Sequence, residues 1–488
     1  MVKKPNILIM VTDQQRGDTI HALGNEWIQT PNLDRLCAEG TAFTSAYTPS
    51  PVCVPGRCCL YTGQYTHHNR CYDNGYPMPD SRFLMEEFRD AGYVTEGVGK
   101  MHFAPDPGAL HGFQHRYRQE ELVEHIEDDD YLIYLRDKGY RHVFEPYGQR
   151  SELYYIPQLS QLPAQDHPTQ WAGDRAVRFL QERERGQPFF LMANFIHPHP
   201  PFSPPTPWNK LYRTADMPGP LSVEKPEECL TYYNHFQNIY KYRSRGIDEN
   251  LVRTLRGFYY ACISFVDYQV GRILSELEHQ GILDDTIIVY TSDHGEMLGD
   301  YNCFGKRSML NSASRVPMLV RYPALFERAA VCRRPVSLVD VAPTVLNAAE
   351  IHFSMELDGE DMAGVARGKS SRRYVMGALE KGPRGLYMLT DGACKYVFSA
   401  PDDQAYFFDG AETENKLEAC REQAEVFRRE LISILKTAPD CEAVDGDDFR
   451  HYPVLHAVDS DSALLFQDNP AFRDQEFCLP APYQFRRR

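Results

Sequence analysis

The sequence lacks the features that mark membrane-spanning and exported proteins. No run of about 18 apolar residues occurs in its 488 residues, so we expect no membrane-spanning helix. The apolar stretch Ile7–Val11 follows two lysines but is too short for the hydrophobic region of an export signal, and we interpret it as a buried strand. We therefore expect a cytoplasmic protein. Secretion stays an alternative if an export segment precedes residue 1.

A basic surface and a disulfide framework are also missing. The net charge of -16 argues against nucleic acid as a partner, because phosphate binding needs a basic stripe. It does not exclude a small anionic substrate, which responds to the local field of its pocket. The 13 cysteines are odd in number and scattered, so we expect reduced thiols. No CxxC partner accompanies the cysteines of residues 53–59, which argues against a zinc site.

Strand and helix patterns alternate along most of the chain. Apolar runs such as "NILIMV", "PFFLMANFI" and "TIIVY" are separated by helical patterns, which predicts an α/β protein with a mostly parallel central sheet flanked by helices. Short strands and one helix then predict a smaller C-terminal α+β subdomain, an antiparallel sheet plus a helix. We expect a main domain over 1–370, the subdomain over 371–440 and an extended tail over 441–488. The tail is rich in aromatic residues and is expected to pack on the body or on another subunit of a homo-oligomer.

Polar side chains follow two of the predicted strands where each strand ends. Asp13 and Gln14 follow "ILIMVT", and Asp293 and His294 follow "IIVYTS". Ligands collect at the carboxyl ends of parallel strands, where two aspartates would repel each other without a cation between them. Oxygen-rich sets suit Ca²⁺, Mg²⁺ or Mn²⁺. The alternative is that each aspartate caps a loop or helix, but the matched positions favour a metal site.

Further segments offer cationic side chains. Lys100 and His102 stand at alternate positions of "VGKMHF" and would point the same way from an extended segment. His197 and His199 lie in the proline-stiffened loop "HPHPPF", and Lys306 lies in "FGKRS". Each alone is more often a surface lysine or a hydrogen-bonded histidine. Together they would form a cationic pocket beside the metal, which is what a tetrahedral anion needs.

The stretch "CVPGRCC" admits several interpretations. Cys53 is a candidate nucleophile, because the nearby Arg57 would lower a thiol pKa. The alternative is an ordinary helix start with Cys58 and Cys59 as buried residues. Asn74, in "YDNGYP", is typical of a turn and is also a candidate to reach a substrate.

The order of these motifs carries a family resemblance. "CVPGR" matches the pattern C-x-P-x-R, and "NILIMVTDQ", "TPNLDRLCAEGTAFTSAY", "GKMHF", "IHPHPPF", "SDHGEMLGD", "FGK" and "RVPMLVRYP" occur around it in the family's order. Over residues 5 to about 350 the chain resembles the type I, formylglycine-dependent sulfatases of the alkaline-phosphatase-like superfamily. The resemblance implies an alkaline-phosphatase-like fold and a sulfuric ester hydrolase.

The resemblance also implies a metal ion and a modified residue. Cys53 would be oxidised after translation to Cα-formylglycine, so a formylglycine-generating or anaerobic maturase enzyme is an expected partner. Ca²⁺ is the expected ion, with Mg²⁺ or Mn²⁺ as alternatives. The implied metal ligands are Asp13, Gln14, Asp293, His294 and the group derived from Cys53.

The remaining roles come from the same resemblance. Arg57 would hold the modified side chain. The groups that would grip sulfate and move protons are Lys100, His102, His199 and Lys306. One hydroxyl of the hydrated aldehyde would attack sulfur, and the second would allow sulfate to be released.

The expected substrate is a small anionic sulfate monoester, first of all a sulfated carbohydrate. Choline and aryl sulfates are alternatives, as is phosphonate monoester or phosphodiester hydrolysis on the same scaffold, because Gln14 and His294 resemble choline-sulfatases and phosphonate hydrolases. "GKMHF" is closer to the sulfatases. Gly56 is less usual than Ser or Ala in the motif and puts efficient maturation in doubt. A binding protein with a decayed site is the third hypothesis. We expect specificity to reside in residues 70–80, 105–165, 200–250 and the tail.

Overall fold

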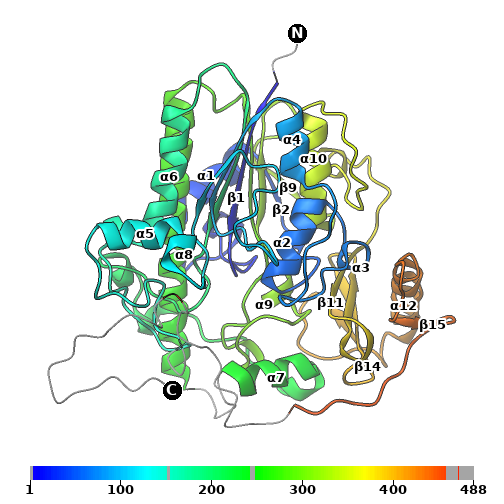
Figure 1. Cartoon of the computed structure of the whole chain (residues 1–488). Helices are drawn as coiled ribbons and strands as arrows, with labels where there is room; N and C mark the ends of the chain where they lie inside the picture. The colour runs from blue at the N-terminus through cyan, green and yellow to red at the C-terminus, as the bar shows by residue number, and fades with distance from the viewer. Residues whose placement is uncertain (1–3, 151–153, 242–247, 458–470, 472–488) are drawn as a thin grey trace.

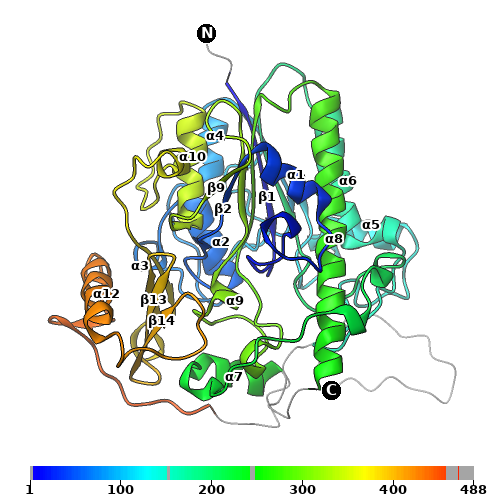
Figure 2. The same ribbon diagram turned by 180° about the vertical axis from the view of Figure 1, so that it is seen from behind.

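The computed structural model describes residues 4–150, 154–241, 248–457 and 471. A central sheet of eight strands lies between two layers of helices (Figures 1 and 2). In sheet order the strands are β5 (His115–Arg118), β4 (Val94–Gly99), β6 (Phe189–Phe195), β1 (Asn6–Thr12), β7 (Thr286–Ser292), β8 (Met318–Arg321), β2 (Thr41–Phe43) and β9 (Ala330–Cys332).

The sheet is mostly parallel, as the sequence predicts. Among its paired strands β8 alone runs antiparallel to its neighbours β7 and β2. β1 lies at the centre and pairs in parallel with β6 and β7, so that Val11 is level with Asn194 and with Thr291. Every residue of β1, β6 and β7 is buried, because helices cover both faces. This explains their unbroken apolar runs.

Each face of the sheet has its own core. Ile7, Ile9 and Val11 point toward helices α2 (Cys53–Thr62), α4 (Leu84–Asp90) and α10 (Val341–Ala348). Leu8 and Met10 point the other way, toward α1 (Pro31–Glu39), α6 (Pro168–Glu182) and α8 (Glu249–His279). The alternation along β1 follows the two-residue period of a strand. The shorter helices are α3 (Thr66–Asn69), α5 (Asp130–Asp137), α7 (Tyr232–Lys241), α9 (Asn311–Ser314) and α11 (Met362–Ala366).

A second, antiparallel sheet follows, with the predicted helix packed on it. Its strands pair in sequence order, and α12 (Arg421–Leu435) covers one face with Phe427 and Leu431. Two short pairs complete the strands, β3 (Ala46–Tyr47) with β10 (Val336–Ser337) and β15 (Val444–Asp445) with β16 (Asp448–Phe449). The strands of the antiparallel sheet are β11 (Val375–Leu379), β12 (Leu386–Thr390), β13 (Cys394–Ser399) and β14 (Gln404–Asp409).

The fold class is thus confirmed, whereas the division into 1–370, 371–440 and 441–488 stays a prediction. Much of the predicted tail, residues 458–470 and 472–488, lies outside the described residues. Among the described helices, none combines the length and the apolar character that a bilayer crossing requires.

Candidate active site and metal centre

Four neighbouring strands bring the predicted residues to one edge of the sheet. Asp13 follows β1, Asp293 follows β7, and Lys100 follows β4. His199 lies in the loop after β6, where its backbone N–H donates to the carbonyl of Ile196 at 3.0 Å. Because β4, β6, β1 and β7 are adjacent, their carboxyl ends converge, as expected for an open parallel sheet.

Helix α2 begins at this edge with Cys53. Val52 before it is extended, and the helix ends at Gly63 in the left-handed region, where the backbone N–H donates to Cys59. Gly56 allows the helix to approach β7, since an added Cβ would lie 2.9 Å from the carbonyl oxygen of Asp293. The helix is buried along its whole length, so its first turn is held firmly against the strand ends.

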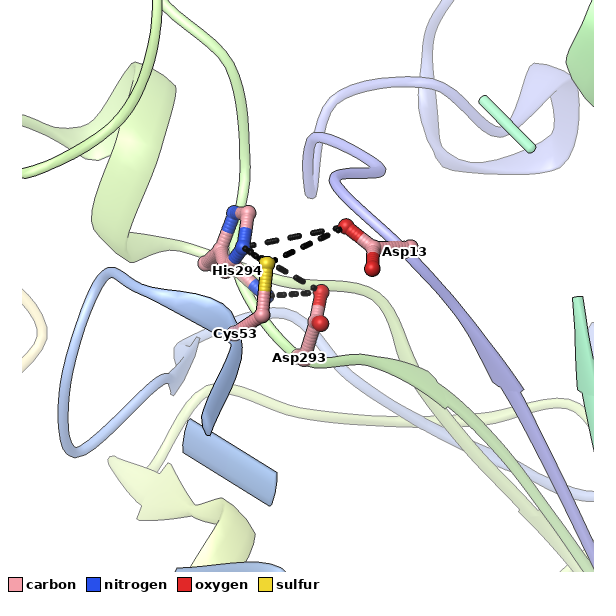
Figure 3. Close-up of side chains that lie close together, drawn as sticks. All are labelled: Asp13, Cys53, Asp293 and His294. Atoms are coloured by element: carbon pink, nitrogen blue, oxygen red, sulfur yellow. Dashed lines mark hydrogen bonds and ion pairs between the residues drawn. The ribbon is translucent and has the colours of Figure 1, made fainter. Parts of the chain in front are cut away.

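A donor cluster suited to a metal ion lies where these elements meet (Figure 3). Donor atoms of Asp13, Cys53, Asp293 and His294 all lie within 4.8 Å of one another. His294 Nε2 is 3.8 Å from Asp13 Oδ1 and 3.6 Å from Asp293 Oδ1. His294 Nδ1 is 3.0 Å from the carbonyl oxygen of Gly295, which can only accept, so Nδ1 carries the proton and Nε2 presents its lone pair to the cluster.

Arg57 fixes both carboxylates of this cluster from below. Its Nε donates to Asp293 Oδ2 at 2.9 Å and its Nη2 to Asp13 Oδ2 at 3.2 Å. Its Nη1 donates to the carbonyl of Lys100 at 2.6 Å. The arginine thus occupies one oxygen of each aspartate, and the Oδ1 atoms are left on the side of His294.

Gln14 supplies an independent sign that a cation fits here. Its amide nitrogen donates to Glu296 Oε2, whereas its amide oxygen is buried and has no hydrogen-bond partner among the described residues. A buried orphaned oxygen is costly unless something occupies the space before it. The backbone of Gln14, at φ 69°, also donates to Asp293 Oδ1 at 3.0 Å. Carboxylate and amide oxygens are ligands that hard divalent cations prefer, so these residues could hold one.

Cys53 lies among positive charges. Its Sγ is 2.7 Å from Lys306 Nζ and 3.2 Å from His294 Nε2. Burial raises the pKa of the Cys53 thiol, but Lys306 and Lys100 together hold that pKa well below its ordinary value. An unmodified Cys53 would therefore be a thiolate.

The other predicted cationic groups surround Cys53. The Lys100 Nζ, which is fully buried, contacts Asp13 Oδ2 at 2.8 Å. Burial lowers the pKa of His199. His102 has a left-handed backbone at φ 56°, and its buried Nδ1 has no hydrogen-bond partner in the part of the chain that the structure describes. His197 is different: its Nδ1 is 3.0 Å from Thr169 Oγ1, and its ring does not line the cavity described next.

A cavity of about 800 Å³ opens above Cys53. Asn74 is part of its wall and also accepts a hydrogen bond from the backbone of Val54 at 3.0 Å, so it acts at the helix start and faces the cavity. Lys100 and Arg57 are fully buried and do not line the cavity. The predicted site residues that line the cavity are Cys53, Asn74, His102, His199 and Lys306.

The wall also contains residues that sequence reasoning missed. Glu121 and Arg150 lie within residues 105–165, a stretch predicted only to contribute to specificity, and no motif singles them out. Glu120 accepts hydrogen bonds from the backbone of His102 at 3.2 Å. The remaining lining includes Tyr76, Phe103, Tyr154, Gln237 and Arg307.

Comparison with known proteins shows which family the chain matches and which proteins it is similar to. Residues 5–351 match the family model described as Sulfatase. The chain is 29% identical to an arylsulfatase of Clostridium perfringens over 92% of this chain and 98% of that protein. It is 28% identical to an N-acetylglucosamine-6-O-sulfatase of Bacteroides thetaiotaomicron over 74% of this chain and 71% of that protein. Among solved structures, the phosphonate monoester hydrolase of Agrobacterium radiobacter superposes with a TM-score of 0.77 at 25% identity, covering 89% of this chain and 96% of that one.

Proposed function

Because the chain belongs to the sulfatase family and is a sulfuric ester hydrolase, we propose that its substrate is a sulfate monoester of a carbohydrate. We further propose that residue 53 works as Cα-formylglycine beside a divalent cation, Ca²⁺ first, with Mg²⁺ or Mn²⁺ as alternatives. The observation that carries the proposal is the position of Cys53, which lines the cavity, belongs to the metal-donor cluster and lies 2.7 Å from Lys306 Nζ. A binding protein with a decayed site does not fit this conclusion.

The proposed groups would supply a nucleophile. A hydrated aldehyde has two hydroxyls on one carbon, and a divalent cation lowers the pKa of a bound hydroxyl to near neutrality. The residues that would hold the cation are Asp13, Gln14, Asp293 and His294, with residue 53 as a further ligand.

The surrounding residues supply binding and proton transfer. Lys306 lies beside residue 53 and Lys100 lies beside Asp13, and both offset negative charge on the sulfate oxygens. His199, with Lys306, provides the proton for the leaving oxygen, and His102 accepts the proton whose loss allows sulfate to leave. Arg57 keeps both aspartates in place throughout.

The cavity supports a sugar rather than a purely apolar group as the alcohol portion. Its lining includes Asn74, Gln237 and Arg307 together with the rings of Tyr76 and Phe103. Such a mixture suits hydroxyl groups and the apolar faces of a sugar ring. Aryl and choline sulfates stay alternatives, since relatives include an arylsulfatase and a choline-sulfatase of Rhizobium meliloti.

Two partners belong to this proposal. One is a formylglycine-generating or anaerobic maturase enzyme that modifies Cys53. The other is a second copy of the chain, bound through residues 441–488. Sedimentation of the full chain and of a chain ending at residue 457 tests the second partner; equal and monomeric behaviour of both would contradict it.

Peptide mass spectrometry and a substrate panel test the function. Protein matured by its native host is expected to contain the aldehyde residue at position 53 and to release sulfate from defined sulfated mono- and disaccharides faster than from aryl or choline sulfate. Residue 53 found wholly as thiol would count against the formylglycine chemistry. Faster turnover of choline sulfate would contradict the carbohydrate substrate.

The second candidate is phosphonate monoester or phosphodiester hydrolysis. It is favoured by the structural similarity to the Agrobacterium radiobacter enzyme over most of both chains. Rates on an aryl sulfate and on a phosphonate monoester with the same leaving group separate the two candidates. Phosphonate turnover that exceeds sulfate turnover would replace the first proposal by the second.

A further inference from the structure

A carboxylate lies beside two of the residues that are proposed to act on sulfate. Glu121 Oε2 is 3.0 Å from Lys100 Nζ and 3.5 Å from His199 Nε2. The side chain of Glu121 is only 11% exposed and lines the cavity. Burial raises the pKa of Glu121, but His199, Lys100 and Arg150 outweigh burial and hold that pKa well below its ordinary value. The group is therefore an anion inside a cavity built for anions.

Arg150 holds this carboxylate from the other side. Its Nη1 donates to Glu121 Oε1, so the two oxygens of Glu121 face different cations. The guanidinium of Arg150 lies 5.2 Å from the ring centre of Tyr154 and is itself only 7% exposed. A planar arginine held by a ring and a carboxylate has little freedom, so the position of Glu121 is well defined.

Lys100 is held between two carboxylates, Asp13 and Glu121. Asp13 also belongs to the metal-donor cluster, where its charge would be shared with a cation. Of the two carboxylates beside Lys100, Glu121 is then the one whose charge is not shared with the metal cation. It is also the carboxylate within reach of His199 on the cavity side. Both groups that act on sulfate and on the leaving oxygen are thus tied to one side chain.

We propose that Glu121 is a positioning residue, which holds Lys100 and His199 at a fixed separation from each other, and that Arg150 anchors it. This inference rests on the proposed function. It predicts that loss of the Glu121 charge strengthens sulfate binding, because a negative charge at this place weakens it. A merely structural carboxylate would lower stability when removed, but its removal would not strengthen anion binding.

The substitution Glu121→Gln separates charge from shape. We expect kcat for an aryl sulfate to fall about 100-fold, because misplaced catalytic groups lose that much. We expect the Kd for inorganic sulfate, measured by calorimetry on the metal-loaded protein, to become tighter by about tenfold, as loss of one nearby like charge implies. An unchanged kcat, or weaker sulfate binding, would overturn the proposal.

Two further variants make the test independent of folding defects. Glu121→Asp keeps the charge and shortens the reach, so kcat should fall while the Kd for sulfate stays unchanged. Arg150→Gln removes a cation, so kcat should fall and the Kd should weaken, the opposite sign to Glu121→Gln. A wild-type kcat in Glu121→Asp would contradict the assignment. A change of the sulfate Kd in the same direction in Glu121→Gln and Arg150→Gln would also contradict it.

Glu124→Gln is the matched control, since Glu124 is exposed in the same segment and does not line the cavity. It should have wild-type kcat and sulfate affinity, and a change equal to that of Glu121→Gln would overturn the proposal. The binding measurements also separate this inference from the function on which it rests. If wild-type protein turns over no sulfate ester, the proposed function fails. The sulfate affinities of the variants still test whether the Glu121 charge acts on the anion site.

Discussion

Single residues around Cys53 are fixed by buried ionic contacts rather than by the motif alone. Arg57 has no exposed surface and bonds to Asp13, Asp293 and the backbone of Lys100. A buried arginine with fewer acceptors would carry a large desolvation penalty. The C-x-P-x-R spacing therefore places Arg57 one helical turn after Cys53, beneath the side chain that reacts.

We expect Cys53→Ala to abolish turnover while the free energy of unfolding changes by less than about 1 kcal/mol. Cys53 lies at the start of a helix and on a cavity floor, so its loss removes chemistry more than packing. Cys58→Ala is the matched control. Cys58 is fully buried in the core beneath α2, so that variant should lose about 1 kcal/mol and keep its activity. Activity assays and urea unfolding of both variants test this. The prediction fails if Cys53→Ala loses stability and keeps activity while Cys58→Ala loses activity and keeps stability.

Asp293→Asn should lose metal affinity and activity together. The substitution keeps the shape but removes the charge that would balance a cation, and we expect at least about a 100-fold loss of affinity. Calorimetric titration with Ca²⁺ and a sulfate-release assay provide the measurement. Asp284→Asn is the control, because Asp284 is an exposed residue near the other end of β7. An active Asp293→Asn enzyme without bound metal would disprove the assignment.

The sequence predicts the residues that belong to recognisable motifs, and it misses those that only support them. Asp13, Asp293, Cys53 and Lys306 fall into one cluster, as expected from strand ends and motif order. Glu121 could not be singled out, because the segment "QEELVEHIEDDD" offers several similar acids and no periodicity. Its position follows from long-range packing of an irregular segment, for which local sequence rules give no guide.

At the scale of elements, the antiparallel sheet supports the start of α2. The backbone N–H of Ala378 in β11 donates to the carbonyl of Pro49 at 2.9 Å, and Glu380 donates to Tyr72 at 3.1 Å. The segment that leads into Cys53 therefore has a C-terminal strand beside it. The sequence predicts both elements, but it does not predict that one lies against the other, because their separation in the chain is large and no motif links them.

Helix α1 depends on a cap from another helix. Asp267 in α8 accepts hydrogen bonds from the backbone N–H of Leu33 at 2.7 Å and from the side chain of Asn32 at 2.9 Å. We expect Asp267→Ala to lower the free energy of unfolding by about 2 kcal/mol, because it leaves buried donors at a helix N-terminus without an acceptor. Asp267→Asn retains an oxygen and should lose less. Equal stability of Asp267→Ala and wild type in urea would refute this role.

The same residue should make stability depend on pH. Burial, followed by a smaller contribution from Asp34, raises the pKa of Asp267 to about 6 despite its backbone donors. The folded state thus keeps a proton that the unfolded chain releases near pH 4, so the contribution of Asp267 to stability decreases as pH rises from about 4 to 6. The difference between wild type and Asp267→Asn should fall by up to about 3 kcal/mol over this range. A difference that increases with pH would have the wrong sign.

At the scale of the whole molecule, the antiparallel sheet and the main body share a core on each face of that sheet. One face of the antiparallel sheet packs with α12 and with Cys59, Tyr65 and Val339 of the main body. The other face packs against body residues that include Tyr47 and Met297. Fold class and the order of the elements could be predicted from the alternation of strand and helix patterns. The shared core could not, because apolar residues on a predicted strand do not reveal their partner.

The shared core leads to a prediction about cooperativity. Since both faces of the antiparallel sheet are buried against the rest of the described chain, separating it would expose a large apolar surface. We expect one unfolding transition in urea, with the same midpoint for near-ultraviolet circular dichroism, which reports packing, and far-ultraviolet circular dichroism, which reports backbone structure. A chain ending at residue 370 should be insoluble or unfolded, and should lose the aryl-sulfate activity of the full chain because the support of α2 is missing. Two separate transitions, together with a folded and active 1–370 fragment, would show instead that the C-terminal subdomain is independent of the active site.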